Sequence, residues 1–263
     1  MVDQDVVRRV EVNGHTATAD ELRALALVNY GHFSTMQVRG RRVRGLGLHL
    51  FRLDTASREL FGTGLDGRRV RRLLAHALGD DVEDAQARVT VFRIAPGAEP
   101  SVMVSLRAPS AMPHEPRSLR SVPYQRPLAH LKHVGTFAQI YYGRLAEREG
   151  YGEALFVGPG GLVCEGSVTN IGFHDGTRLL WPDAPMLLGT TMQLLDAALT
   201  AVGKPPRRDV VRLADLASLG TAFICNSGGL APVGRIDDVH LPIDRDVVTM
   251  LHDVFDAVPG SPI

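Results

Sequence analysis

The order in which strand-like and helix-like segments follow one another is the feature of this sequence that most constrains its fold. Strand patterns outnumber helix patterns in both halves of the chain, and their order is too irregular for the strand–helix alternation of a doubly wound sheet. The sequence therefore predicts an α+β fold. The predicted strands are 6–12, 33–39, 87–94, 102–106, 119–124, 153–157, 169–174, 178–181, 221–225 and one near Val233, and the predicted helices are 48–60, 68–78, 137–149, 191–202 and 247–257.

A proline-rich segment divides the chain. Residues 108–116 contain three prolines and no hydrophobic periodicity, which is typical of a linker between domains. We therefore expect an N-terminal α/β domain with a mostly antiparallel sheet over residues 1–110, a linker over 111–118, and a β-rich C-terminal domain over 119–263.

Composition argues against several classes of protein. The net charge of zero argues against nucleic acid as the main partner, and the arginine clusters at 39–44 and 68–72 are expected to be solvated faces. Two cysteines in 263 residues do not make a disulfide framework, which fits a reducing compartment. Residues 1–5 are acidic, unlike the start of a signal peptide, and no window reaches the ~20 apolar residues of a membrane span. We expect a soluble, cytoplasmic protein that binds neither nucleic acid nor membrane.

Lysine is scarce in this chain: Lys132 and Lys204 are the two lysines, against 27 arginines. Lys204 lies between Gly203 and Pro205, in a loop where a solvated charge needs no explanation. Lys132 instead opens an apolar stretch, where an ammonium group is costly. Arginine stays protonated and cannot form a Schiff base, whereas a buried lysine can. Lys132 is therefore a candidate nucleophile, with a salt bridge or a snorkelling side chain as the alternative.

Four other segments carry residues that could serve a charged ligand. Glu165 ends an apolar strand, and Thr190–Thr191 precede a helix whose free amides could bind an anion. Asn226–Ser227 lie in a glycine-containing turn, and Arg52 lies between apolar neighbours. Each also has an ordinary structural interpretation, such as a helix N-cap or a buried ion pair. Together, a Schiff-base lysine, a buried carboxylate and a distributed anion site are what pyridoxal 5′-phosphate requires.

The order of these motifs, from about Tyr30 to about Asp238, resembles the class IV aminotransferases. These fold type IV pyridoxal-phosphate enzymes include branched-chain and D-amino acid aminotransferases and aminodeoxychorismate lyase. The matching segments are Gly31–Thr35, His49–Leu53, Lys132 to Gly150, Glu165–Ile171, Leu187–Met192, Asn226–Ser227 and Pro232–Val233. The resemblance implies a two-domain α+β fold like that of D-amino acid aminotransferase, with a C-terminal pseudo-barrel domain that carries Lys132.

The resemblance also implies a role for each residue. Lys132 would form the Schiff base and act as general acid and base, and Glu165 would contact the pyridine nitrogen of pyridoxal phosphate. The cofactor phosphate would be bound by Arg52, Thr190, Thr191 and Ser227, and Asn226 would also contact the cofactor. Candidate contacts of the substrate are Thr35, Arg93 and Arg39, and no metal is implied.

The expected function is that of an aminotransferase acting on a small amino acid and 2-oxo acid pair. One alternative is a lyase of the aminodeoxychorismate type, which would release pyruvate, and another is a non-catalytic ligand-binding or interaction protein on the same scaffold. Two departures from the family pattern motivate the non-catalytic alternative: Phe137 replaces a tyrosine of branched-chain enzymes, and Met192 replaces an arginine of the phosphate turn. The resemblance further implies a homodimer, which would cover the edges of apolar strands such as 102–106.

Overall fold

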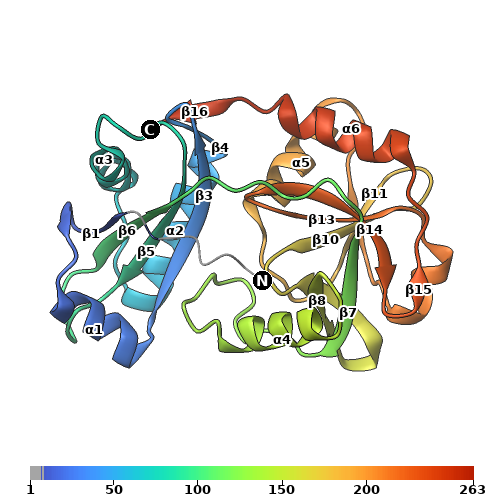
Figure 1. The fold of residues 1–263 in the computed structure, drawn as a ribbon, viewed down its shortest axis with the longest axis horizontal. Coiled ribbons are helices and arrows are strands. Elements are labelled where there is room, and N and C mark those ends of the chain that lie inside the picture. The colour runs from blue at the N-terminus through green and yellow to red at the C-terminus, as the bar shows by residue number, and fades with distance from the viewer. Residues whose placement is uncertain (1–6, 8) are drawn as a thin grey trace. The chain divides into compact units, whose positions relative to one another are not determined.

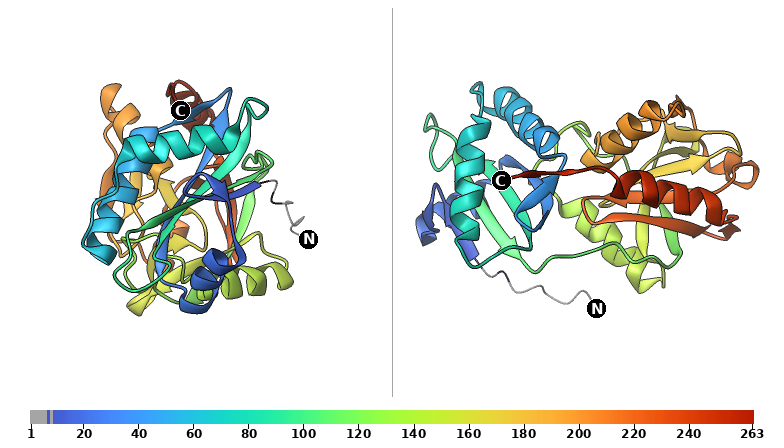
Figure 2. Two further views of the ribbon diagram at one scale, coloured as in Figure 1. Left: turned by 90° about the vertical axis from the view of Figure 1, so that its left-hand side faces the viewer. Right: turned by 90° about the horizontal axis from the view of Figure 1, so that it is seen from above.

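The computed structural model describes residue 7 and residues 9–263, which form two compact units. Unit 1 comprises the described residues up to Ser110 together with Leu131–Gly135 and Pro259–Ile263. Unit 2 comprises Ala111–His130 and Thr136–Val258. Figures 1 and 2 show the helices and strands of each unit, coloured along the chain. Among the described helices, none is long and apolar enough to cross a membrane.

Unit 1 is built on a seven-stranded sheet in the order β16-β4-β3-β5-β6-β1-β2, in which neighbouring strands are antiparallel. Its strands are β1 (Arg9–Val12), β2 (His15–Thr16), β3 (Gly31–Arg39), β4 (Arg42–Arg44), β5 (Ala85–Phe92), β6 (Ser101–Arg107) and β16 (Gly260–Pro262). Its helices are α1 (Ala19–Val28), α2 (Leu46–Phe61) and α3 (Gly67–Leu78). The β3–β5 pairing runs from Gly31 opposite Phe92 to Val38 opposite Ala85.

Helices α2 and α3 pack on one face of this sheet (Figure 1). Side chains alternate along each strand, so Met36 of β3 and Val89 of β5 point into one core. The helices contribute residues at helical spacing to that core, among them Leu46, Leu53, Val70, Leu74 and Leu78. Both helices end at a glycine with positive φ, Gly62 and Gly79.

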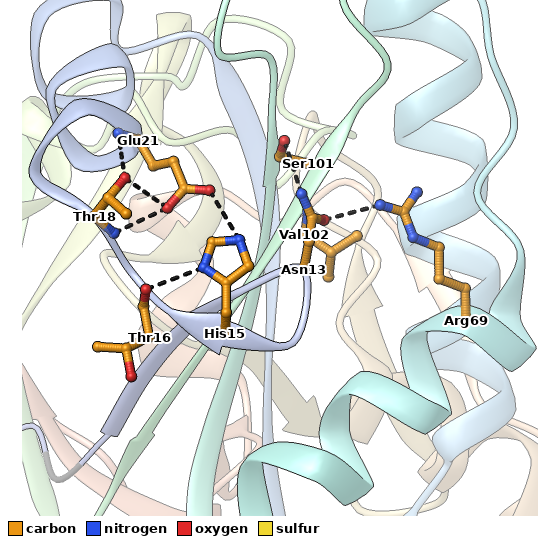
Figure 3. A network of polar contacts seen from close by, with 8 residues as sticks. All are labelled: Asn13, His15, Thr16, Thr18, Glu21, Arg69, Ser101 and Val102. Carbon is orange, nitrogen blue, oxygen red and sulfur yellow. Dashed lines mark hydrogen bonds and ion pairs between the residues drawn. The ribbon is translucent and has the colours of Figure 1, made fainter.

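Helix α1 has no counterpart in the sequence-based prediction, although its N-terminus carries a recognisable signal. Thr18 and Glu21 form a capping box: the Thr18 hydroxyl accepts from the Glu21 amide at 3.3 Å, and Glu21 Oε2 accepts from the Thr18 amide at 2.9 Å (Figure 3). His15 Nε2 lies 3.5 Å from the same carboxylate. A threonine followed three residues later by a glutamate, before an apolar run, is enough to locate this helix start.

The turn at Asn13 and Gly14, two residues with positive φ, is hydrogen-bonded to two other elements of unit 1. Asn13 Oδ1 accepts from the Val102 amide at 3.0 Å and from Arg69 Nη2 at 2.9 Å (Figure 3). One side chain therefore connects the turn after β1 with both β6 and α3.

Unit 2 contains a nine-stranded mixed sheet in the order β12-β11-β10-β13-β14-β7-β8-β9, with β15 paired to β14. Its strands are β7 (Arg117–Pro123), β8 (Glu153–Gly158), β9 (Leu162–Gly166), β10 (Asn170–His174), β11 (Leu179–Pro182), β12 (Arg207–Asp209), β13 (Ala222–Asn226), β14 (Gly229–Ile236) and β15 (Val239–His240). Its helices are α4 (Phe137–Arg148), α5 (Thr190–Ala201) and α6 (Arg245–Asp256), with short 3-10 helices at Pro159–Gly161 and Leu213–Ser218. Strand β7 runs parallel to both of its neighbours, β8 and β14.

Two hydrophobic cores of unit 2 share strand β13, because its alternate residues point to opposite faces of the sheet. Ile224 packs with Ile171 of β10 in one core. Phe223 and Cys225 pack in the other, together with residues of α5 and α6 such as Leu195 (Figure 1). The alternation of β13 therefore attaches these two helices to the sheet.

The structure differs from the predicted domain boundaries at three places. Strand β7 begins at Arg117, so the last two residues of the predicted linker 111–118 belong to a strand. Lys132 was expected in the C-terminal domain but belongs to unit 1, because the Phe33 amide donates to Lys132 O at 2.8 Å and the Val134 amide donates to Gly31 O at 2.9 Å. The segment Pro259–Ile263 also belongs to unit 1, where β16 pairs with β4.

Several short strands were not predicted. Strands β2, β4, β12, β15 and β16 have two or three residues each, too few for an alternating pattern to be recognised. The first predicted strand, 6–12, is described from Arg9 as β1, whereas Val6 and Arg8 lie outside the described residues. The acidic residues 1–5 also lie outside them.

Candidate functional site

Three polar side chains of unit 1, Ser34 of β3 and His49 and Arg52 of α2, form a hydrogen-bonded cluster. Arg52 Nη2 donates to Ser34 Oγ at 2.5 Å, and Ser34 Oγ lies 2.7 Å from His49 Nδ1. A guanidinium group only donates, so the serine hydroxyl can direct its own hydrogen to Nδ1. Burial, followed by the charges of Arg52 and Lys132, lowers the pKa of His49 well below its usual 6.5. The ring is therefore neutral near pH 7 and can accept that hydrogen.

Arg52 is a mostly buried cation with unused hydrogen-bonding capacity. Burial lowers its pKa to about 10, which leaves it charged near neutral pH. Its Nε atom is buried without a hydrogen-bond partner, and no carboxylate among the described residues pairs with this guanidinium. A buried charge without a counter-charge is unfavourable. An anionic ligand is the kind of group that would compensate it.

Lys132 lies beside the aromatic ring of Phe33 on β3. Its Nζ atom is 4.9 Å from the ring centroid, and the guanidinium carbon of Arg88 is 3.6 Å from the same centroid. Burial, and secondarily the charge of Arg107, lower the pKa of Arg88 to about 10. Within the described part of the chain, Arg88 has no carboxylate partner. Unit 1 therefore presents a lysine amine and an arginine on one aromatic ring.

Arg88 is a candidate functional residue that the sequence-based reasoning missed. It lies on β5 between the fully buried Ala87 and Val89, and it stands opposite Thr35 of β3 in the sheet register. An arginine in the middle of an apolar strand is the signal that could have identified it, because a charge in such a place usually has a partner or a function.

The remaining sequence-predicted residues of unit 1 have different surroundings. Thr35 is half-buried on β3. Arg93 Nη2 donates to the carbonyl of Phe61 at 2.8 Å, and its guanidinium lies 5.2 Å from the Phe61 ring, so it binds the C-terminal end of α2. Arg39 Nη2 donates to the carbonyl of Ser110 at 3.0 Å. Both arginines therefore have structural partners within unit 1.

Glu165 of β9 is the buried carboxylate of unit 2, with 5% of its surface exposed. Arg126 Nε donates to Glu165 Oε1 at 2.7 Å, and the Leu187 amide donates to Oε2 at 3.1 Å. Each carboxylate oxygen thus has one donor and a further lone pair. The carboxylate is fixed in orientation and can still accept a hydrogen bond from a ligand.

The N-terminus of α5 offers unused donors in the same unit. Gly189 is its N-cap and supplies no side-chain hydrogen bond, so the first amides of the helix lack side-chain capping. The hydroxyl of Thr190 is buried and has no hydrogen-bond partner. Any side chain on Gly189 would collide with Asn170 Oδ1, which explains the glycine. Uncapped amides, the positive end of the helix dipole and an unpartnered buried hydroxyl together fit an anion.

The turn between β13 and β14 adjoins the start of α5. Thr191 Oγ1 donates to the carbonyl of Asn226 at 2.7 Å, and the Gly228 amide donates to Asn226 Oδ1 at 2.8 Å. Ser227 is half-buried in this turn. Unit 2 therefore places the start of α5 beside the turn that contains Asn226 and Ser227.

The two departures from the family pattern have clear surroundings. Met192 is fully buried in the core beneath α5, so this position serves packing. Phe137 begins α4 with 79% of its surface exposed and stacks on Tyr141. Tyr141 also contacts Tyr142, which packs with Tyr124 and Phe156 in the same aromatic cluster. Within the described residues, no group of three His, Cys, Asp or Glu side chains could hold a metal ion.

Comparison with protein families and solved structures gives a consistent result. A family model described as amino-transferase class IV matches residues 31–236. A hypothetical aminotransferase from Mycobacterium tuberculosis in its PLP-bound form is similar to the chain, with 24% identity, a TM-score of 0.83 and coverage of 95% of this chain and 98% of that one. No curated protein sequence matches.

Two further solved structures carry different activities in their names. A 4-amino-4-deoxychorismate lyase from Pseudomonas aeruginosa has 26% identity and a TM-score of 0.79, covering 95% of this chain and 99% of that one. A branched-chain aminotransferase from Thermoproteus uzoniensis has 18% identity and a TM-score of 0.83, covering 95% and 94%. These likenesses confirm the predicted fold.

The histidine at the start of β3 predicts acid sensitivity. His32 is 1% exposed, its Nε2 lies 2.9 Å from Ser57 Oγ, and its buried Nδ1 has no partner. Burial, and secondarily Arg52, lower its pKa to about 4. As the pH falls, His32 is protonated near pH 6.5 in the unfolded chain but stays neutral in the folded chain until about pH 4. The free energy of unfolding therefore decreases as the pH falls from 6.5 toward 4.

We expect this group to remove about 3 kcal/mol of unfolding free energy between pH 7 and pH 4. Urea unfolding of the wild type and of His32→Gln at both pH values would measure the difference. His240→Gln, at an exposed histidine, is the matched control and should keep the wild-type pH dependence. Equal pH dependence in wild type and His32→Gln would contradict the prediction.

Proposed function

The chain belongs to the class IV aminotransferases and is an enzyme of this family, and from that premise we propose that it is a pyridoxal 5′-phosphate-dependent aminotransferase of a small amino acid and 2-oxo acid pair. The observation that carries the proposal is the pair of buried, unpartnered donors at phosphate-motif residues, Arg52 Nε and Thr190 Oγ1. A phosphate dianion is a ligand that would satisfy such donors. The residues present therefore fit the cofactor.

When bound, pyridoxal phosphate supplies a ring that accepts the electron pair left on Cα after proton removal. Lys132 would hold the cofactor covalently through its amine, and the same amine would then take the Cα proton and return it. The position of Nζ beside the Phe33 ring supports this role, because an apolar neighbour limits the access of water to the amine.

Glu165 would accept a hydrogen bond from the pyridine nitrogen. Its two oxygens each retain a lone pair after binding Arg126 and Leu187, which supports this assignment. The phosphate would be bound by Arg52, the first amides of α5, Thr190, Thr191, Asn226 and Ser227. Of these, Arg52 would contribute most, since a guanidinium can pair two phosphate oxygens at once.

Substrate recognition would use the face of the unit 1 sheet that carries Thr35. Arg93 and Arg39 have structural partners, which weakens the case for each as a substrate contact. Arg88 stands opposite Thr35 and has no carboxylate partner within the described residues, so we propose it as the cation that a substrate carboxylate meets.

A lyase of the aminodeoxychorismate type is the second candidate function. It is favoured by the 26% identity with the Pseudomonas aeruginosa lyase and by the phenylalanine at position 137, where branched-chain enzymes have a tyrosine.

We also propose that the enzyme is a cytoplasmic homodimer. Sedimentation of a fully active monomer at micromolar concentration would contradict the dimer.

The two reactions give different products, which provides the test of function. As an aminotransferase, the purified enzyme should convert a D- or L-amino acid and 2-oxoglutarate into a new oxo acid and glutamate. The lyase alternative predicts pyruvate from aminodeoxychorismate and no dependence on an added oxo acid. A protein that binds the cofactor but turns over neither substrate class would indicate the non-catalytic alternative.

Lys132 is predicted to be the residue that bonds to the cofactor. Borohydride reduction of the cofactor-loaded protein, followed by peptide mapping, should place a pyridoxyl group on Lys132, because Lys204 lies in a loop where its Nζ lies 3.8 Å from Met250 Sδ. Lys204→Arg is the matched control and should keep the adduct, whereas Lys132→Arg should lose both the adduct and turnover. An adduct on Lys204 in the wild type would remove Lys132 from the mechanism.

Arg52→Ala is predicted to raise the Kd for pyridoxal phosphate by about 10- to 100-fold, the equivalent of one strong charged hydrogen-bonded pair. Equilibrium dialysis would measure the Kd. Arg58→Ala, on the same helix, removes an exposed arginine that pairs with Asp54 and should leave the Kd unchanged. Equal Kd values for Arg52→Ala and wild type would exclude Arg52 from the phosphate site.

A further inference from the structure

We infer that Arg126 is a positioning residue that fixes the Glu165 carboxylate for the ring nitrogen of the cofactor. Its role rests on the proposed function, in which Glu165 contacts that nitrogen. Arg126 lies outside the family motifs, in a loop directly before Pro127. Its side chain contacts Glu165 and the backbone of Ala129 in unit 2.

The two side chains form a buried ion pair. Their exposed fractions are 4% for Arg126 and 6% for Glu165, and Nε lies 2.7 Å from Oε1. Among the described ion pairs, each of the others has at least one partner more than 20% exposed. Surface pairs contribute little, whereas breaking a buried pair leaves an uncompensated charge. Among these pairs, the loss of Arg126–Glu165 should therefore lower the stability of the folded chain most.

Arg126 also holds the turn that precedes Lys132 in the sequence. Its Nη2 donates to the carbonyl of Ala129, across a turn in which Leu128 has a positive φ of 49°. One planar guanidinium thus binds a backbone carbonyl with one nitrogen and the Glu165 carboxylate with another. Lysine has a single charged nitrogen and could not replace both contacts with the same geometry.

The carboxylate is held from two directions. Arg126 binds Oε1, while the Leu187 amide binds Oε2, and the carbonyl of Leu187 is in turn bound by Asn170 Nδ2 at 2.7 Å. A carboxylate with both oxygens anchored cannot rotate, so its remaining lone pairs point in fixed directions. A cofactor ring nitrogen would meet an acceptor that is already oriented, which is the condition for a strong interaction in the reaction.

The guanidinium of Arg126 also supplies a positive charge beside the Glu165 carboxylate. The titratable groups that act on this carboxylate within unit 2 are Arg126, Tyr124 and Cys164. Burial raises the pKa of both Tyr124 and Cys164, so both remain neutral near pH 7. Arg126 is then the counter-charge of this buried carboxylate in unit 2.

The first test measures this charge coupling without cofactor, by urea unfolding of the full chain at pH 5 to 8. In Arg126→Met the buried carboxylate of Glu165 has lost this counter-charge, so its ionised form opposes folding and stability should fall as the pH rises. Relative to Arg126→Met/Glu165→Gln, the unfolding equilibrium constant of Arg126→Met should increase with pH, by at most about tenfold per pH unit, and level off once the carboxylate is ionised in both the folded and the unfolded chain. Wild type relative to Glu165→Gln should show no such increase.

Arg117→Met is the matched control for removing an arginine of unit 2. Arg117 Nη2 donates to the carbonyl of Gly152 at 2.9 Å, without a described carboxylate pair. The pH dependence of the unfolding equilibrium constant of Arg117→Met should be the same with and without Glu165→Gln. If Arg126→Met does not fold, the double variant restores the charge balance and should fold, and Arg126→Lys supplies a second comparison. If Arg126→Met and Arg126→Met/Glu165→Gln show the same pH dependence of unfolding, the inference is overturned.

The second test measures exchange of the Cα proton of an amino acid substrate by the loaded enzyme. Glu165→Gln and Arg126→Met should each slow exchange at least about tenfold, corresponding to ~1.4 kcal/mol, and the double variant should be no slower than the slower single one. Independent, multiplying effects would show that Arg126 acts only through the turn, which contradicts the inference. Normal exchange in Glu165→Gln would instead overturn the proposed role of Glu165 itself, and the charge coupling in the first test would then describe a structural ion pair.

Discussion

The antiparallel pairing of β3 with β5 is the constraint on which the candidate site of unit 1 depends. Because side chains alternate along a strand, this register directs Ser34 toward α2 and Phe33 and Thr35 to the opposite face. The backbone of β3 also binds the segment of Lys132, through the amide of Phe33. A slip of one residue would exchange the two faces and separate both Ser34 from Arg52 and the Phe33 ring from Lys132.

In unit 2 a short irregular segment has a comparable position. The amide of Leu187 binds Glu165, its carbonyl binds Asn170, and Gly189 two residues later starts α5 without a side-chain cap. The same few residues therefore orient a carboxylate and present the uncapped end of a helix. Packing of α5 through Met192 holds that end in place, which explains an apolar residue where the family pattern has an arginine.

Both units contain buried polar groups whose hydrogen bonds are incomplete. Nε of Arg52 and Oγ1 of Thr190 lack partners, and Arg88 has an aromatic ring in place of a described carboxylate. Unpaired buried groups reduce stability, and folded proteins retain few of them. A ligand that satisfies these donors would add its binding free energy to the stability of the folded chain. Glu165 is different, because Arg126 compensates its charge within the unit.

Local sequence patterns determined much of this protein. The pattern of apolar residues predicted α2 and α3 with ends close to those observed, and the ordered motifs from Gly31 to Val233 predicted the family. The overlooked α1 was also readable, through Thr18 and Glu21. Only the tertiary structure decided that Lys132 lies beside β3 and that Lys132 and Arg88 contact the same ring, that of Phe33. It also decided that Arg126 pairs with Glu165. Such partners lie tens of residues apart in the chain, and they meet through strand register and loop closure, whereas periodicity reports only whether a residue is buried and not against which residue.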